Sequence, residues 1–199
     1  MFFENSNSII LASASPRRRE LLSTIGLKFE VVPPHINEEM LAGETPKEYV
    51  ARLSKAKATA IGKKFVNYWI LGADTIVSID GEVLEKPRTE AEAYSMLRKL
   101  SGREHRVLTG FFIYHTRNQK SFGDVVESWV KIKRLEEEEI RAYINTGEPF
   151  DKAGAYAAQG QGMFMIEKIS GSFTNVIGLP VCEVINAFRE LGAIKFWFG

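Results

Sequence analysis

The residues of this chain best suited to chemistry stand directly after its first apolar segment. The apolar run 9–12 is followed by Ser13-Ala14-Ser15-Pro16-Arg17-Arg18-Arg19. Ser15 is a suitable N-cap and Pro16 a suitable first helical residue, so the arginines fall in the first turn of a helix. Positive charge there opposes the helix dipole, and a bound phosphate would resolve this conflict by accepting hydrogen bonds from backbone N–H and guanidinium groups. An exposed basic turn explains this run, taken alone, equally well.

Asp74 interrupts an otherwise apolar, strand-like segment, Leu71-Gly72-Ala73-Asp74-Thr75-Ile76-Val77. A carboxylate is costly to bury there unless it meets a cation or hydrogen-bond donors. Such a group can hold a divalent metal, orient a water molecule or act as a general base, and the small residues before it leave room for a ligand. The alternative is an aspartate that only bonds to a neighbouring loop.

Three further charged residues could complete a polyphosphate site. Glu38 lies in a loop after two prolines and is a candidate second metal ligand. Lys55 lies near the middle of a predicted helix, and Lys86 precedes a proline that could aim it across a cleft. Solvation explains each of these residues alone. Together with Arg17 and Arg18 they supply the positive charge that a triphosphate needs, with Mg²⁺ neutralising the remainder.

The stretch 150–162 is rich in glycine and alanine, which is typical of a backbone that approaches a ligand closely. Within it, Gln159 could recognise the edge of a base. Its amide offers one acceptor and two donors, which match uracil or thymine, but the amide can rotate and therefore does not exclude cytosine. A plain surface loop is the alternative interpretation.

Helix and strand signals alternate along the chain and predict an α/β fold. Capping boxes begin at Thr45 and Thr89, and Asp80-Gly81 is a strong hairpin signal. The predicted helices cover residues 45–61, 89–100, 136–144 and 180–191, and the predicted strands cover residues 9–12, 29–32, 68–79, 83–84, 105–115, 121–135 and 163–169. We expect one domain, residues 1–199, with a mixed twisted sheet, flanking helices and two lobes around a cleft. The aromatic tail 196–198 is expected to pack on the core, with a subunit contact as the alternative.

Composition narrows the functional classes. The chain has 199 residues and a net charge of +1, which argues against a general nucleic-acid or membrane-surface binder and favours a small anionic ligand. A single cysteine, Cys182, suits a reducing compartment, and no apolar run approaches a membrane span. Three scattered histidines give no zinc spacing and are expected to be structural. We expect a cytoplasmic protein with no membrane and no nucleic-acid partner.

Several motifs in order resemble the Maf family of nucleotide pyrophosphatases. They are Ser13-Ala14-Ser15-Pro16-Arg17-Arg18, Gly72-Ala73-Asp74-Thr75, Lys86-Pro87, Asp151-Lys152-Ala153-Gly154-Ala155-Tyr156 with Gln159-Gly160, and Gly171-Ser172 to Gly178-Leu179-Pro180. The resemblance covers nearly the whole chain. It implies a fold similar to the inosine-triphosphate pyrophosphatases (the Maf/Ham fold). It also implies hydrolysis, dependent on Mg²⁺ or Mn²⁺, of a nucleoside triphosphate to the monophosphate and pyrophosphate.

The resemblance also implies roles for individual residues. Asp74 takes the proton-acceptor position and, with Glu38, a metal position. The remaining charged or phosphate-binding positions fall on Lys55, Lys86, Ser13 and Arg17. Base preference is assigned to Arg18, Thr75 and Gln159, a triplet similar to the branch that acts on dTTP and UTP rather than on 7-methylated GTP.

Two departures and two rival functions accompany this resemblance. Asn37 stands before Glu38 where the family commonly has an aspartate, and Lys131-Ile132-Lys133 stands where many members have a central phenylalanine. One rival function is a nucleotide-sensing regulatory protein linked to cell division and septum formation. The other is a purine-specific inosine-triphosphate pyrophosphatase. A homodimer is expected from the resemblance alone.

Overall fold

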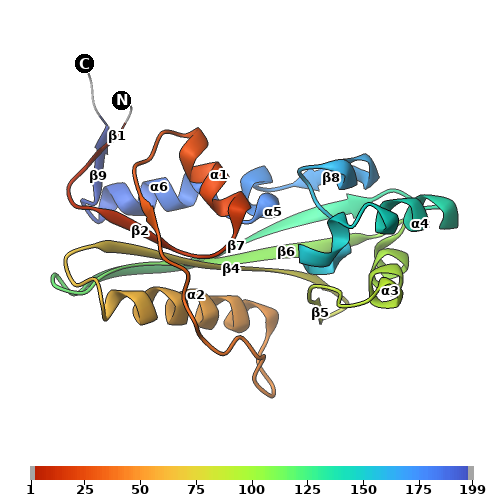
Figure 1. The fold of residues 1–199 in the computed structure, drawn as a ribbon, viewed down its shortest axis with the longest axis horizontal. Coiled ribbons are helices and arrows are strands. Elements are labelled where there is room, and N and C mark those ends of the chain that lie inside the picture. Colours follow the sequence, from red (N-terminus) through yellow and green to blue (C-terminus); the bar gives the residue numbers. More distant parts are fainter. Residues whose placement is uncertain (1–2, 197–199) are drawn as a thin grey trace.

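One long mixed sheet forms the centre of the computed structural model, which describes residues 3–196 (Figure 1). The seven-stranded sheet has the order β3-β2-β4-β6-β7-β8, with β5 paired to β4. Its strands are β2 (Ile9–Ala12), β3 (Glu30–Val31), β4 (Trp69–Ile79), β5 (Glu82–Leu84), β6 (Glu104–His115), β7 (Lys120–Ile132) and β8 (Ile166–Ser170). Strand β2 runs parallel to β3 and β4, whereas β4, β6, β7 and β8 pair antiparallel. The predicted mixed sheet is therefore confirmed.

Helices cover both faces of this sheet (Figure 1). Their bounds are α1 (Pro16–Thr24), α2 (Pro46–Gly62), α3 (Glu90–Leu100), α4 (Glu137–Asn145), α5 (Phe173–Ile177) and α6 (Val181–Glu190). Helix α2 lies on one face, and α1, α5 and α6 lie on the other. Short 3₁₀ helices, η1 (Glu148–Asp151), η2 (Ala153–Ala155) and η3 (Gln161–Met165), lie between α4 and β8. Within residues 3–196, no helix is both long and apolar enough to cross a membrane.

Two main clusters of buried apolar side chains divide the molecule into lobes that share the sheet. The first lobe packs Leu71 of β4 with Phe188 of α6. The second lobe packs Val77 of the same strand with Leu97 of α3 and Ile140 of α4. Because β4 runs through both clusters, residues near its middle lie between the lobes. Asp74 occupies that position.

The chain ends also meet, in a small separate sheet. Strand β1 (Phe3–Asn5) pairs antiparallel with β9 (Ile194–Phe196). Phe196 packs against the first lobe, which agrees with the expectation for the start of the aromatic tail. Trp197 and Phe198 lie outside the described residues.

Most local signals in the sequence correspond to the observed elements. Thr45 forms the predicted capping box with Glu48, and Asp80 and Gly81 have φ values of +54° and +81° in the β4–β5 hairpin. Two strand predictions were wrong at one end. The strand expected at 121–135 ends at Ile132. The strand expected from residue 163 begins at Ile166, because residues 161–165 form the 3₁₀ helix η3.

Gly72 of β4 lets helix α2 approach the sheet closely. A Cβ atom there would lie 2.2 Å from the backbone oxygen of Ser54 and 2.7 Å from the backbone nitrogen of Ala58. We expect Gly72→Ala to lower the free energy of unfolding by about 3 kcal/mol, because the helix must shift to make room. Urea unfolding of the two proteins measures this difference. An unchanged midpoint would show that the contact is less close than described.

His105 of β6 gives the stability a pH dependence. It is buried, with 1% of its surface exposed, and its Nε2 lies 2.7 Å from the hydroxyl of Tyr156. Burial lowers the pKa of His105 from 6.5 to about 4. Between about pH 6.5 and pH 4 the unfolded chain binds a proton at this histidine that the folded chain does not. The free energy of unfolding therefore falls as the pH falls through this range.

We expect the protonation of His105 to lower the free energy of unfolding by about 3 kcal/mol as the pH falls through this range. Comparing wild type with His105→Gln by urea unfolding at about pH 7 and about pH 4 isolates the effect, because the other titrating groups are shared. The wild type should lose more stability than the variant. Equal losses in the two proteins would contradict this assignment.

Candidate active site

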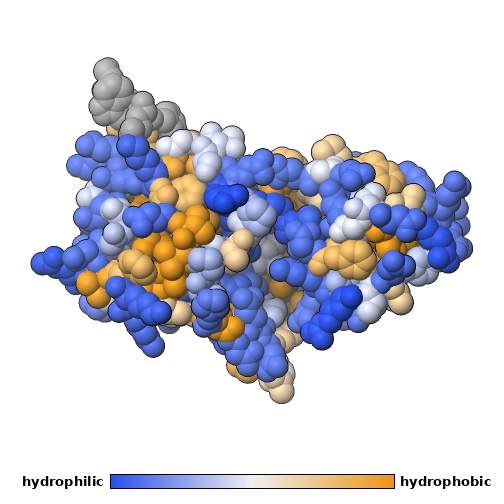
Figure 2. All heavy atoms as spheres, in the orientation of Figure 1, coloured by the Kyte–Doolittle hydropathy of each residue, from blue (hydrophilic) through white to orange (hydrophobic). Residues whose placement is uncertain are grey.

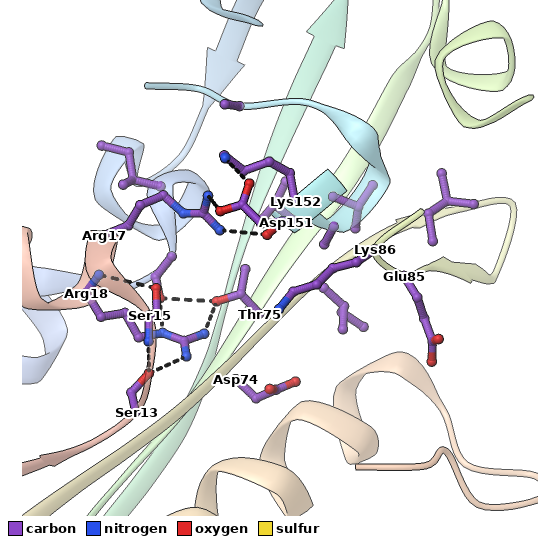
Figure 3. A pocket seen from close by; sticks show the side chains of 18 of the residues that line it. Ser13, Ser15, Arg17, Arg18, Asp74, Thr75, Glu85, Lys86, Asp151 and Lys152 are labelled. Atoms are coloured by element: carbon purple, nitrogen blue, oxygen red, sulfur yellow. Dashed lines mark hydrogen bonds and ion pairs between the residues drawn. The ribbon is translucent and has the colours of Figure 1, made fainter. Parts of the chain in front are cut away.

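A cleft of about 840 Å³ opens between the two lobes, at the middle of β4. Figure 2 shows this part of the surface as a hollow bordered largely by hydrophilic residues. The β2–α1 turn, β4, the segment after β5 and residues 150–159 supply its walls (Figure 3). The cleft is lined by nearly all of the residues singled out in the sequence, namely Ser13, Arg17, Arg18, Glu38, Asp74, Thr75, Lys86 and Gln159. Residues from distant parts of the chain therefore share one cavity, as predicted.

The β2–α1 turn brings Arg17 and Arg18 to the cleft, and Arg17 is the more exposed of the two. Ser15 caps α1 by accepting a hydrogen bond from the backbone N–H of Arg18, and Pro16 occupies the first helical position, as predicted. Arg17 reaches toward η1, where its Nη1 lies 3.7 Å from Oδ2 of Asp151 (Figure 3). The Arg17 side chain keeps 26% of its surface exposed. Its guanidinium group is therefore available to an anion entering the cleft.

Arg18 has a different environment, because it is buried and bound on three sides. It donates from Nε to the carbonyl oxygen of Gly178 at 2.8 Å, from Nη1 to Ser13 Oγ at 3.1 Å and from Nη2 to Thr75 Oγ1 at 2.9 Å. Burial lowers the pKa of Arg18, and the charge of Asp74 opposes that shift. Arg18 and Thr75 thus form a fixed wall that ties the β2–α1 turn to β4 and to the loop after α5.

Asp74 is paired with a lysine that the sequence analysis did not select. Nζ of Lys57 lies 2.6 Å from Oδ1 of Asp74 and 2.8 Å from Oε2 of Glu38. The side chains of Lys57 and Asp74 keep only 8% and 11% of their surfaces exposed. One ammonium group therefore holds the two candidate metal ligands together, and their oxygens converge at one place.

The backbone of the Glu38 loop is held by the same helix, α2. Tyr49 donates from its hydroxyl to the carbonyl oxygen of Glu38 at 2.6 Å. Burial, with the negative charges of Asp74, Glu85 and Glu38, raises the pKa of Tyr49 to about 12, so the hydroxyl keeps its proton and remains a donor. Asn37 accepts from the backbone N–H of Glu39 at 3.0 Å and donates from Nδ2 to Oε2 of Glu39 at 3.1 Å. Glu38 lines the cleft despite the departure at Asn37.

Lys55 is not in the cleft, so the prediction that it faces the substrate was wrong. Its side chain is exposed, and its Nζ lies 5.7 Å from the centre of the Phe112 ring. A helix turns by about 100° per residue, so positions two apart point to nearly opposite sides. Lys57, not Lys55, shares the buried face of α2 with Leu53 and Ile61.

Lys86 and Gln159 approach the cleft from the second lobe. Lys86 follows β5, and its side chain points back toward Thr75 and Asp74 in Figure 3. No carboxylate of residues 3–196 forms an ion pair with it, which leaves its charge for a ligand. Gln159 donates from Nε2 to Oε1 of Glu20 on α1 at 3.1 Å, so its amide spans the cleft between the lobes.

Comparison with known proteins agrees with this geometry. The family model described as "Maf-like protein" matches residues 8–191. The chain belongs to the Maf family. Among its Maf relatives, the dTTP/UTP pyrophosphatase of Geotalea uraniireducens (strain Rf4) is 52% identical over 189 residues, 95% of this chain and 97% of the relative. The dTTP/UTP pyrophosphatase of Clostridioides difficile (strain 630) is 41% identical over 192 residues, 96% of this chain and 99% of the relative.

Solved structures confirm the expected Maf/Ham fold. A HAM1 protein from Coxiella burnetii matches with a TM-score of 0.52 at 16% identity, covering 92% of this chain and 99% of that one. The Ham1 protein of Staphylococcus aureus matches with a TM-score of 0.50 at 18% identity, covering 92% and 98%. At these identities the likeness concerns the arrangement of helices and strands alone.

Proposed function

We propose that this Maf protein hydrolyses UTP and dTTP between the α- and β-phosphates, releasing the nucleoside monophosphate and pyrophosphate. The observation that carries the proposal is the arrangement of charge in the cleft. Asp74 lies at its base beside Lys57, while Arg17 and Lys86 reach in from opposite lobes. A carboxylate surrounded by three cations is what the hydrolysis of a polyanion requires. The names of its close Maf relatives support the same substrates.

The cations hold the triphosphate chain across the cleft. The β2–α1 turn offers the Arg17 guanidinium and backbone N–H groups at the start of α1, and Lys86 offers an ammonium group that forms no ion pair within residues 3–196. These donors match phosphoryl oxygens in charge and hydrogen-bonding capacity. Charge that develops on the departing pyrophosphate is stabilised by the same groups, which favours cleavage over simple binding.

Asp74 accepts the proton of the attacking water. Lys57 binds its Oδ1, and no group within residues 3–196 forms a hydrogen bond with its Oδ2, so that oxygen is free to accept from a water in the cleft that Asp74 lines. The water attacks the α-phosphorus while Asp74 takes up its proton. Lys57 keeps the carboxylate in one orientation and stabilises its charge before the proton arrives.

The carboxylates of Glu38 and Asp74 also suit a divalent cation. Their oxygens converge on Lys57, although no group of three or more His, Cys, Asp or Glu side chains that could hold a metal occurs in residues 3–196. Mg²⁺ is commonly held by one or two carboxylates together with substrate phosphates, so this donor set fits Mg²⁺ or Mn²⁺ bound jointly with the nucleotide. When bound, the metal would neutralise phosphate charge.

Base selection would combine a fixed wall with an adaptable amide. Arg18 and Thr75 are held rigidly by Ser13 and Gly178, so they limit the shape of the cleft. Gln159 offers an amide that matches the N3–H and a carbonyl oxygen of uracil or thymine.

The experiment that tests the proposal is pyrophosphate release from dTTP, UTP, CTP, GTP, ITP and 7-methyl-GTP with Mg²⁺, and again with EDTA. We expect turnover of dTTP and UTP above the others, and its loss with EDTA. Tight binding of UTP without turnover would indicate a nucleotide sensor instead. Preference for ITP would indicate a purine pyrophosphatase.

We place the enzyme in the cytoplasm, because its single Cys182 and its nucleotide substrates suit a reducing compartment.

A further inference from the structure

A partly buried hydrogen-bond cluster outside the cleft holds the turn that carries Gln159. The carboxylate of Glu148, at the start of η1, accepts from the backbone N–H of Gln161 at 3.0 Å and from that of Gly162 at 2.8 Å. It also accepts from the hydroxyl of Tyr143 on α4 at 2.7 Å. Both oxygens are thus used, and two of the three donors belong to the backbone of one turn.

The turn itself is shaped to receive this carboxylate. Gly160 has a φ of +117°, a conformation that residues with a Cβ rarely adopt. A Cβ atom at this position would lie 2.2 Å from Oε1 of Glu148. The glycine therefore serves both the backbone conformation and the close approach of the carboxylate, and it directly follows Gln159.

Glu148 is ionised in this environment. Burial raises its pKa, but the hydrogen bonds from Tyr143, Gly162 and Gln161 and the charge of Lys152 outweigh burial and leave the pKa below its usual value. An ionised carboxylate accepts hydrogen bonds on both oxygens and donates none. The backbone carbonyl oxygen of Glu148 also accepts from Nζ of Lys152 at 3.3 Å, which links the turn to the cleft wall beside Arg17.

Glu148 does not line the cleft, whereas Gln159 does. We infer that Glu148 is a positioning residue for base recognition: its carboxylate fixes the 159–162 turn so that the Gln159 amide faces the nucleotide. The inference deepens the proposed function and rests on it for the identity of the nucleotide. Because Glu148 does not line the cleft, it should act on binding and base preference, not on the chemical step.

Glu148→Gln tests the inference with little change in size. A glutamine offers one acceptor oxygen, and its NH₂ group cannot accept from the second backbone N–H. We expect the KM for UTP to rise about tenfold with kcat nearly unchanged, because the lost interaction is equal in the ground and transition states. The preference for UTP over CTP should fall, and amide exchange at Gln161 and Gly162 should become faster.

Two controls separate positioning from general destabilisation. Glu137→Gln on α4 removes an exposed carboxylate paired with Arg141 and should leave KM unchanged. In a Gln159→Ala background, Glu148→Gln should raise KM no further, because it acts through the missing side chain. If Glu148→Gln does not fold, Tyr143→Phe removes one of the three donors and should raise KM by a smaller factor.

Additive effects of Glu148→Gln and Gln159→Ala, or a fall in kcat with KM unchanged, would overturn the inference. Wild-type protein that binds UTP without releasing pyrophosphate would instead refute the proposed function. In that case calorimetric Kd values for UTP in the same variants replace KM. A Kd raised by Glu148→Gln only where Gln159 is present would still support the positioning role, and an unchanged Kd would overturn it.

Discussion

Asp74→Asn lowers kcat for pyrophosphate release from UTP by at least about 10², because asparagine keeps the size of the side chain but cannot accept the proton of the attacking water. Folding should survive. Lys57 can still bond to the amide oxygen and retains Glu38 at 2.8 Å as a charged partner. Steady-state kinetics, with thermal unfolding as the check on folding, measures the effect.

The KM for UTP separates this role from a role in binding alone. If Asp74 only helped to hold the nucleotide, Asp74→Asn would raise KM and leave kcat near its original value. Turnover unchanged in a folded Asp74→Asn protein would refute the assignment of Asp74 as the base.

Lys57→Met gives the second large effect, a fall in kcat/KM for UTP of about 10². Lys57 is the cation bound directly to Asp74, at 2.6 Å, so its loss removes both the orientation and the charge partner of the base. It also leaves the carboxylate of Asp74, 11% exposed, without its cation. Lower stability at neutral pH is therefore expected as well.

Lys55→Met is the matched control, because it makes the same change on the same helix two residues away. Lys55 is exposed and lies outside the cleft, so kcat/KM and stability should stay close to those of the wild type. Loss of activity in Lys55→Met together with normal activity in Lys57→Met would contradict the described orientation of α2.

Helix caps and turns were predicted correctly, because they depend on residues that are close together in the sequence. The N-cap at Ser15, the capping box at Thr45 and the turn at Asp80-Gly81 are all observed, because each is determined by contacts within a few residues. The convergence of the β2–α1 turn and Asp74 was also predicted, from the chemistry that they share. It is realised by the parallel pairing of β2 with β4, which places Ala12 beside Gly72.

To choose between Lys55 and Lys57, one must know which face of helix α2 is buried. Residues Val50, Leu53, Ala58 and Ile61 mark its buried face, and Lys57 falls among them. That spacing was a usable signal, since a lysine on an apolar helical face needs a buried partner. Lys55 has the same charge as Lys57, but its side chain lies on the exposed face of α2. Charge alone therefore does not distinguish the two lysines.

Other site features depend on contacts that no local pattern contains. Arg18 donates to the carbonyl oxygen of Gly178, 160 positions later in the chain, and Gln159 meets Glu20 from 139 positions away. Glu148 likewise shows its importance only once the 159–162 turn has folded over it. These arrangements follow from tertiary packing, so the sequence identified the residue types but not their partners.

Hydrolysis of UTP in ¹⁸O-labelled water, with Mg²⁺, tests most directly whether water attacks the α-phosphorus. We expect the label to enter UMP and to be absent from pyrophosphate, because water activated by Asp74 attacks the α-phosphorus. Label found in pyrophosphate, or release of inorganic phosphate in place of pyrophosphate, would contradict it.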